Sequence, residues 1–243
     1  MKPRCYFVTG TDTGVGKTLV TSALLLNARA YGRRAVGLKP VSAGCELIDG
    51  QFMNEDARAL RVLSSVPLSY AEVNPVALVP AMAPHIAAQR AGVALHAAAL
   101  ASAVQGVVDQ ADARHFDTVL VEGAGGWLVP LNDRETMADL AVALGYPVIL
   151  VVAMRLGCLN HALLTAAAIQ SAGLHLAGWV ANGTADGMTA FDDNVRTLEE
   201  RLPALRLGTV PWLGNDVSPE QVNTWLDAMS LFGPVPDSTV PGV

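Results

Sequence analysis

The chain of 243 residues is 51% apolar, so it is long enough for one large α/β domain with a full core, or at most two small domains. Its net charge of −6, with 16 Lys and Arg spread along the sequence, leaves no basic field that would hold a nucleic acid or an anionic membrane. Three cysteines without a C-x-x-C pair favour a reducing compartment over a disulfide scaffold. We expect one domain over residues 1–232, with no nucleic-acid or membrane partner.

Targeting and spanning signals are weak along the whole sequence. The N-terminal residues hold too short an apolar run for a secretory signal. The run 140–154 is broken by Gly145 and Pro147 and is shorter than the ~20 residues that a membrane span needs. These features predict a cytoplasmic protein. Residues 233–243 are rich in Pro, Gly and Val without periodicity, and we expect them to form a flexible tail.

Short apolar runs rich in β-branched residues alternate with longer helical patterns. Continuous runs of this kind are typical of strands buried on both faces of a parallel sheet. In chain order the sequence predicts a strand at 5–9, a helix at 17–31, a strand at 35–39, a helix at 54–63, an irregular proline-rich excursion at 66–84, a helix at 94–111, a strand at 118–122, a helix at 137–144, a strand at 148–153, a helix at 159–172, a strand at 176–182, a helix at 190–202, a strand at 206–210 and a helix at 220–231. The alternation predicts a single-domain α/β fold with a doubly wound, mostly parallel sheet flanked by helices.

The stretch GTDTGVGKT follows the first predicted strand and opens the first predicted helix. It ends like a phosphate-binding loop, G-x-x-x-x-G-K-[ST], but Gly10 lies one residue earlier than the strict spacing requires. Gly14 and Gly16 allow the backbone N–H groups to turn toward a polyphosphate at the helix N-terminus. Lys17 can then reach the β and γ oxygens, and the Thr18 hydroxyl is placed to bind Mg²⁺. The stretch therefore predicts a P-loop NTPase fold with a loop one residue wider than the strict pattern.

Polar residues stand where three further predicted strands end. They are Lys39, Glu122 ahead of a glycine-rich turn, and Asn182. Each alone could be a solvated strand end, a surface carboxylate or a turn residue. Because the carboxyl ends of parallel strands meet at one edge, where ligands bind in open α/β sheets, we expect all three beside the phosphate loop.

Magnesium prefers oxygen ligands, with one or two carboxylates besides a hydroxyl and phosphates. Glu122 and Asp56 are therefore the candidate metal ligands together with Thr18. Asp56 also opens a predicted helix, where an acid is favoured by the helix dipole alone. Its neighbour Glu55 remains open as the alternative.

The motifs GTDTGVGKT, GLKPV, EDA, NPVALVPAMAPHIAA, LVEGAGGWLVPL, VILVVAMRLGCLNHALLT and LAGWVAN followed by PWL together resemble those of the dethiobiotin synthetase family. The resemblance runs from residue 6 to about residue 213. It implies a homodimer with a seven-stranded, mostly parallel sheet that uses ATP, Mg²⁺ and CO₂. The implied reaction converts diaminopelargonic acid into dethiobiotin, the penultimate step of biotin biosynthesis. A substrate amine is carbamated, the carbamate takes the γ-phosphoryl group, and the second amine closes a cyclic urea with loss of phosphate.

The resemblance also implies roles for residues of this sequence. The implied catalytic residues are Lys39, Lys17 and Thr13. The implied ATP-binding residues are Gly14, Val15, Gly16, Lys17, Thr18, Leu19, Asp56, Glu122, Gly123, Ala124, Gly125, Asn182, Gly183, Pro211, Trp212 and Leu213. The implied substrate-binding residues are Thr13, Lys39, Ser42, Ala43, Gly125, Gly157, Cys158, Leu159 and Asn160. The implied metal ligands are Thr18, Asp56 and Glu122.

The segment 157–160 stands at the start of a predicted helix, where free N–H groups suit a carboxylate, although it could simply be a capped helix. In the family this region meets substrate across the dimer interface. Two positions depart from the family pattern. Gly14 stands where some members carry glutamate, and Ala43 stands where the family has a substrate-contacting Ser or Thr. We expect Ser42 to take over that contact, or the hydrogen bond to be missing.

Two other classes share parts of these motifs. A regulatory ATPase of the partitioning or septum-positioning type would carry a second lysine early in the loop, where this sequence has Gly10, Thr11 and Asp12. Many such ATPases also end in a basic amphipathic helix, which the proline-rich tail does not resemble. A cobyrinic or cobyric acid amide-forming synthetase would need a glutaminase domain, for which the sequence is short. The synthetase of the biotin pathway is the function we expect.

Overall fold

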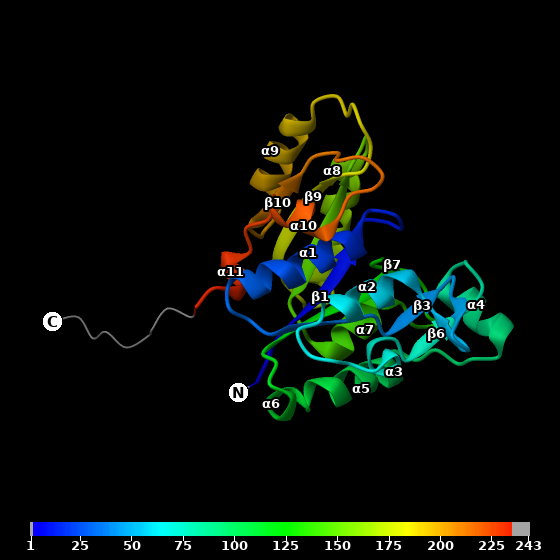
Figure 1. Cartoon of the computed structure of the whole chain (residues 1–243). Coiled ribbons are helices and arrows are strands. Elements are labelled where there is room, and N and C mark those ends of the chain that lie inside the picture. The colour runs from blue at the N-terminus through cyan, green and yellow to red at the C-terminus, as the bar shows by residue number, and fades with distance from the viewer. Residues whose placement is uncertain (1, 235–243) are drawn as a thin grey trace.

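The computed structural model describes residues 2–234, and in them six strands form one central parallel sheet in the order β10-β9-β8-β1-β7-β2 (Figure 1). These strands are β1 (Arg4–Gly10), β2 (Ala35–Leu38), β7 (Thr118–Gly126), β8 (Val148–Met154), β9 (Leu176–Gly183) and β10 (Arg206–Val210). All six were predicted from the sequence, and the predicted α/β class is confirmed. The seven-stranded sheet implied by the family resemblance is not formed among residues 2–234. The strand that follows β2, which is β3 (Val41–Ala43), pairs with β6 (Val76–Leu78) in a separate sheet.

Helices cover both faces of this sheet. The helices of the described residues are α1 (Lys17–Ala30), α2 (Glu55–Leu63), α3 (Tyr70–Val73), α4 (Pro84–Ala91), α5 (Ala97–Val108), α6 (Ala111–Arg114), α7 (Met137–Leu144), α8 (Cys158–Ser171), α9 (Phe191–Arg201), α10 (Pro219–Asn223) and α11 (Met229–Phe232). Of these, α4 packs on the separate pair of strands β3 and β6. In β8, Val148, Leu150 and Val152 join a core cluster with side chains of α5, α7, α8 and α9. Ile149 and Val151 of the same strand face the cluster that includes α1, α10 and α11. This alternation explains why β8 reads as a continuous apolar run.

The parallel arrangement brings the carboxyl ends of all six strands to one edge of the sheet. The registers place Gly10 opposite both Gly126 and Val151, and Val210 opposite Asn182. Loops that are far apart in the sequence therefore meet beside the start of α1. This is the edge at which open α/β sheets bind ligands.

The prediction that residues 66–84 are irregular is wrong in part. Helix α3 is held by a capping box between Ser69 and Glu72, and β6 (Val76–Leu78) pairs in parallel with β3 (Val41–Ala43) in a separate two-stranded sheet. The prolines stand outside these short elements or at the first position of α4, where a missing N–H costs little. Figure 1 shows β3, β6 and α4 together at one end of the molecule, away from α9.

A hairpin also interrupts the loop after β3. Strands β4 (Glu46–Ile48) and β5 (Gln51–Met53) pair antiparallel across Asp49 and Gly50, which both have positive φ angles. An Asp-Gly pair between two short strands is the turn that this geometry favours, so the dipeptide was the signal that could have predicted it.

The predicted helix at 220–231 is wrong as a continuous element. It is divided into α10 and α11, because the backbone between them bonds to other parts of the chain. The side chain of Asn27 donates to the carbonyl of Leu226 and accepts from the N–H of Ala228, and the N–H of Asp227 bonds to the carbonyl of Leu207 in β10. The predicted helix at 94–111 is likewise shorter, and it is followed by the separate turn of α6.

Within residues 2–234, no helix combines the length and the apolar character that crossing a bilayer requires. Most of the predicted tail, residues 235–243, lies outside the described residues. At its start, the carbonyl of Gly233 accepts hydrogen bonds from Arg4 and Arg33, which fixes the end of α11 against the N-terminal strand.

Candidate active site

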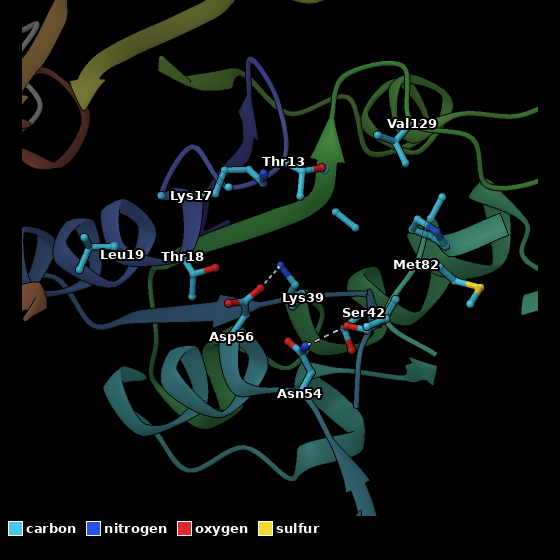
Figure 2. A pocket seen from close by; sticks show the side chains of 18 residues that line it. Thr13, Lys17, Thr18, Leu19, Lys39, Ser42, Asn54, Asp56, Met82 and Val129 are labelled. Atoms are coloured by element: carbon cyan, nitrogen blue, oxygen red, sulfur yellow. Dashed lines mark hydrogen bonds and ion pairs between the residues drawn. The ribbon is translucent and has the colours of Figure 1, made fainter. Parts of the chain in front are cut away.

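A cavity of about 770 Å³ lies at the carboxyl edge of the sheet, in front of the start of α1 (Figure 2). It is lined by Thr13, Gly14, Gly16, Lys17, Thr18, Leu19, Lys39, Ser42, Ala43, Asn54, Asp56, Ala81, Met82, Ala83, Pro84, Ala124, Gly125 and Val129. A second pocket of about 220 Å³ shares Gly14, Gly16 and Leu19 with it and extends over the ends of β9 and β10. The phosphate loop therefore lines two neighbouring spaces, one larger and one smaller.

The early glycine of the loop has a packing explanation. A Cβ on Gly10 would lie 2.5 Å from Cγ2 of Val15, so glycine at this position lets Val15 fold under the loop and become buried. Gly14 and Gly16 have φ angles of +72° and +83°, which favour glycine, and α1 begins directly after them at Lys17. The loop is therefore a backbone cradle at a helix N-terminus, the arrangement that binds phosphates.

Lys17 is buried in this cradle, and its Nζ donates to the backbone carbonyl of Asp12 at 3.1 Å. Burial lowers the pKa of Lys17 to about 8, although the nearby carboxylate of Glu122 acts in the opposite direction. The second ammonium group, that of Lys39, is one of the contributions to this lowered pKa. An anion in the cavity would relieve this cost by pairing with Lys17.

Lys39, directly after β2, lies between two carboxylates. Its Nζ is 2.5 Å from Oε1 of Glu122 and 3.0 Å from Oδ2 of Asp56, and the hydroxyl of Thr18 donates to the same Oε1 at 2.8 Å. Figure 2 shows Lys39 and Asp56 facing each other, with Thr18 beside them. Burial alone would lower the pKa of Lys39, but Glu122 and Asp56 together raise it above the ordinary value. The pKa of Asp56 is lowered in turn, because the attraction of Lys39 outweighs the effect of burial.

The oxygen atoms in this cluster fit a hard divalent cation. Glu122 is 0% exposed, and its Oε2 has no hydrogen-bond partner. Together with the Thr18 hydroxyl and the Asp56 carboxylate, it gives the all-oxygen donor set that Mg²⁺ prefers. The side chain of Glu55 is exposed and does not line the cavity. Across residues 2–234, no group of three or more His, Cys, Asp or Glu side chains lies in metal-binding proximity.

The second pocket is formed where β9 and β10 end. Asn182 is buried, and its Nδ2 donates to the carbonyl of Val15 at 2.9 Å, which ties β9 to the phosphate loop. Gly183 approaches the backbone of the next strand end so closely that a Cβ would lie 2.7 Å from the amide nitrogen of Trp212. With Pro211, Trp212 and Leu213 lining it, this pocket offers an apolar and aromatic surface next to polar backbone.

Some of the residues that the family resemblance implies for substrate binding line the larger cavity. Thr13, Lys39, Ser42, Ala43 and Gly125 line it. Ser42 is buried, and its hydroxyl donates to Oδ1 of Asn74 at 2.7 Å.

Residues 157–160 lie elsewhere. They form the start of α8, where Gly157 is the N-cap, and none of them lines either pocket within the described part of the chain. Arg155, just before them, forms an ion pair with Asp12 of the phosphate loop at 2.7 Å. Leu156 between them is 99% exposed. A ligand confined to these two pockets would therefore not contact residues 157–160 of the same chain.

Several lining residues were missed by the sequence analysis. Ala81, Met82, Ala83 and Pro84 lead into α4, and Val129 follows β7; in Figure 2, Met82 and Val129 lie on the side of the cavity away from Leu19. These residues lie within two of the motifs that carry the family resemblance, NPVALVPAMAPHIAA and LVEGAGGWLVPL. None of these five residues carries a charged or hydroxyl group that would have indicated a site.

Comparisons with known proteins agree with this geometry. A family model described as an AAA domain matches residues 4–221. The ATP-dependent dethiobiotin synthetase BioD of Pseudomonas paraeruginosa is 51% identical over 226 residues, which cover 93% of this chain and 97% of that protein. The protein of the same name from Cellvibrio japonicus is 51% identical over 232 residues, or 96% of this chain and 99% of that one.

Solved structures with lower identity share the fold. The MinC:MinD cell division complex of Aquifex aeolicus matches with a TM-score of 0.55 at 12% identity, over 93% of this chain and 87% of that chain. Chloroplast FtsY of Physcomitrella patens matches with a TM-score of 0.55 at 20% identity, over 96% of this chain and 64% of that chain. At these identities the likeness concerns the fold alone.

The sheet order, the glycine cradle and the matched family model define a nucleotide-binding α/β protein of the P-loop class. Within that class, identity near 50% over almost the whole length decides the family. The chain belongs to the ATP-dependent dethiobiotin synthetase family. The regulatory ATPase is the less supported alternative, because the likeness to the MinC:MinD complex concerns the fold alone.

The ion pair between Lys39 and Glu122 should contribute to stability. We expect Lys39→Met to lower the free energy of unfolding by roughly 3–5 kcal/mol, because it leaves the Glu122 carboxylate buried without a cation. The double variant Lys39→Met/Glu122→Gln should recover most of this loss, since neither member of the ion pair is then left as a buried charge without its partner. Urea unfolding of the nucleotide-free protein measures both values. Lys17→Met is the control, and it should not destabilise because burial already disfavours the Lys17 charge. Equal midpoints for Lys39→Met and the wild type would contradict the expected stabilisation.

Nucleotide binding should take up protons near pH 8. In the free protein part of the Lys17 population is neutral at this pH, since its pKa is lowered to about 8. A bound phosphate favours the ammonium form, so the pKa rises on binding and affinity falls as pH increases from 8 toward 10. Calorimetry of ADP binding at pH 8 in buffers of different ionisation enthalpy measures the uptake. Lys17→Arg, which remains charged, should show none; equal uptake by both proteins would assign it to another group.

Proposed function

We propose that this protein is an ATP-dependent dethiobiotin synthetase that carboxylates diaminopelargonic acid with CO₂ and closes the cyclic urea, forming ADP and phosphate. This is the penultimate step of biotin biosynthesis. The observation that carries the proposal is the burial of Lys39 beside Thr18, in the same cavity as the phosphate loop. The near-complete alignment with proteins of that name supports the choice of reaction.

The chemistry needs positive charge at one point. A carbamate that attacks the γ-phosphate brings two anions together, and charge then accumulates on the transferring group. Lys17 at the helix start and Lys39 at the end of β2 supply two ammonium groups inside one cavity. Lys39 would face the carbamate and the γ-phosphate, and Lys17 would hold the β and γ oxygens.

Mg²⁺ is the proposed cofactor, held by Thr18, Asp56 and Glu122. When bound, it would neutralise charge on the β- and γ-phosphates. The unpartnered Oε2 of Glu122 supports this assignment, since a buried carboxylate oxygen otherwise lacks compensation.

The two pockets suggest how ATP and substrate divide the space. The adenine would lie in the smaller pocket against Asn182, Gly183 and residues 211–213, with its phosphates over residues 14–19 and the turn 122–125 behind them. The diamine would occupy the larger cavity along Thr13, Lys39, Ser42 or Ala43, and Gly125.

We also propose that the working form is a cytoplasmic homodimer. Residues 157–160 of a second copy would then bring the N-terminus of α8 to the substrate carboxylate. Support comes from their place at the start of α8, outside both pockets of their own chain.

The proposed reaction is tested with ATP, Mg²⁺, bicarbonate and diaminopelargonic acid as the only reactants. Phosphate and dethiobiotin should appear in equal amounts, and neither should form when the diamine is omitted. ATP turnover that does not depend on the diamine would favour a regulatory ATPase instead.

Asp56 and Glu55 provide a matched pair for the metal assignment. We expect Asp56→Asn to raise the Mg²⁺ concentration for half-maximal activity by roughly tenfold or more, because a carboxylate ligand is lost. Glu55→Gln, which removes the same charge from the exposed neighbour, should change it less than twofold. A metal titration of initial rates distinguishes them, and the reverse result would move the ligand to Glu55.

A further inference from the structure

Asn74 is buried next to the cavity without lining it. It follows α3 and is 2% exposed, and its side chain reaches two segments that do line the site. Its Nδ2 donates to the carbonyl of Lys39 at 2.6 Å and to that of Val76 at 3.3 Å. Its Oδ1 accepts from the hydroxyls of Ser42 at 2.7 Å and Tyr70 at 2.9 Å. All four hydrogen-bonding positions of the amide are therefore used.

The network continues from Asn74 to the start of α2. The hydroxyl of Tyr70 accepts from the N–H of Asn54 at 2.7 Å, and Asn54 caps α2 by accepting from the N–H of Ala57 at 3.3 Å. Asp56, which pairs with Lys39, lies in the first turn of this helix. Nδ2 of Asn54 also donates to the carbonyl of Ala43 at 3.2 Å.

Three separate parts of the cavity wall thus depend on one amide. These are the end of β2 at Lys39, the strand β3 with Ser42 and Ala43, and the first turn of α2 with Asp56. β3 and α2 lie outside the central sheet, so its ladder does not fix them relative to Lys39. Two backbone hydrogen bonds also join the end of β2 to the segment around Asn74. They run from the N–H of Lys39 to the carbonyl of Val73 and from the N–H of Val76 to the carbonyl of Pro40.

The network also sets the polarity of Ser42. A serine hydroxyl has one hydrogen to donate and two lone pairs. Its hydrogen is directed to Oδ1 of Asn74, and the thiol of Cys45, whose Sγ lies 3.4 Å away, takes one lone pair. The second lone pair of the oxygen is left as an acceptor. A substrate amine brings N–H donors, which is the complement that this arrangement can use.

We propose that Asn74 is a positioning residue of the synthetase site, which orients Lys39, Ser42 and the Asp56 turn toward the reacting groups. This inference rests on the proposed function. Asn74 acts through these residues and does not itself touch substrate. Since effective catalysis depends on placement within about 1 Å, loss of the shared amide should reduce turnover more than nucleotide binding.

The test compares Asn74→Ala with Asn27→Ala. Asn27 is a second buried asparagine with three hydrogen bonds, but its partners lie at residues 223–228, away from the cavity. We expect Asn74→Ala to lower kcat by roughly 10- to 100-fold while the Kd for ADP changes less than threefold. Asn27→Ala should lower the unfolding midpoint without changing kcat of the folded protein. Equal kcat for Asn74→Ala and Asn27→Ala, both measured on folded protein, would overturn the proposal.

Two milder variants keep the test informative if Asn74→Ala does not fold. Ser42→Ala removes the proposed acceptor, so it should raise KM for the diamine and leave the Mg²⁺ requirement unchanged. Tyr70→Phe releases Asn54, so it should raise the Mg²⁺ requirement through Asp56 and leave that KM unchanged. Unchanged values for both variants would overturn the proposal. A wild-type protein that makes no dethiobiotin would instead contradict the proposed function, so that assay is run first.

Discussion

The site depends on a buried cluster of opposite charges. Lys39 is almost completely enclosed, and it is stable as an ammonium group only because Glu122 and Asp56 lie within 3.0 Å of it. Burial of either partner alone would cost several kcal/mol. The cluster can exist because β2 and β7 are parallel neighbours, so the residues that end their apolar runs face each other. The sheet topology is therefore the condition for the chemistry.

The two lysines of the cavity differ in a way that follows from their partners. Lys39 has two carboxylates in direct contact, and its pKa is raised. Lys17 has a backbone carbonyl as its hydrogen-bond partner, and burial lowers its pKa to about 8. One ammonium is thus compensated within the protein, whereas the other gains most from an incoming anion. This division suits a site in which one lysine holds the nucleotide and the other faces the reacting group.

The small layer outside the central sheet has a structural purpose. β3 and the start of α2 form part of the cavity wall, β6 supports β3 from behind, and Asn74 joins this layer to the end of β2. Apolar packing anchors this wall to the core through Val41, Ala57 and Leu78. Because such packing is not directional, polar contacts are needed to set the exact placement of the side chains that line the cavity. The fully bonded amide of Asn74 meets that need at a point where three segments converge.

The sequence by itself determined the six central strands, the cradle from Gly14 to Thr18 and the residues that end the strands, such as Lys39 and Glu122. These depend on local periodicity and on the rule that parallel strands share one edge, so they can be derived without coordinates. Tertiary structure alone decided the role of Gly10, which makes room for Val15. It likewise decided the break between α10 and α11, where Asn27 of α1, far away in the sequence, bonds to the backbone. It also decided that Asn74 links Lys39, Ser42 and α2, because the partners of a buried amide are chosen by chain packing and leave no periodic pattern in the sequence.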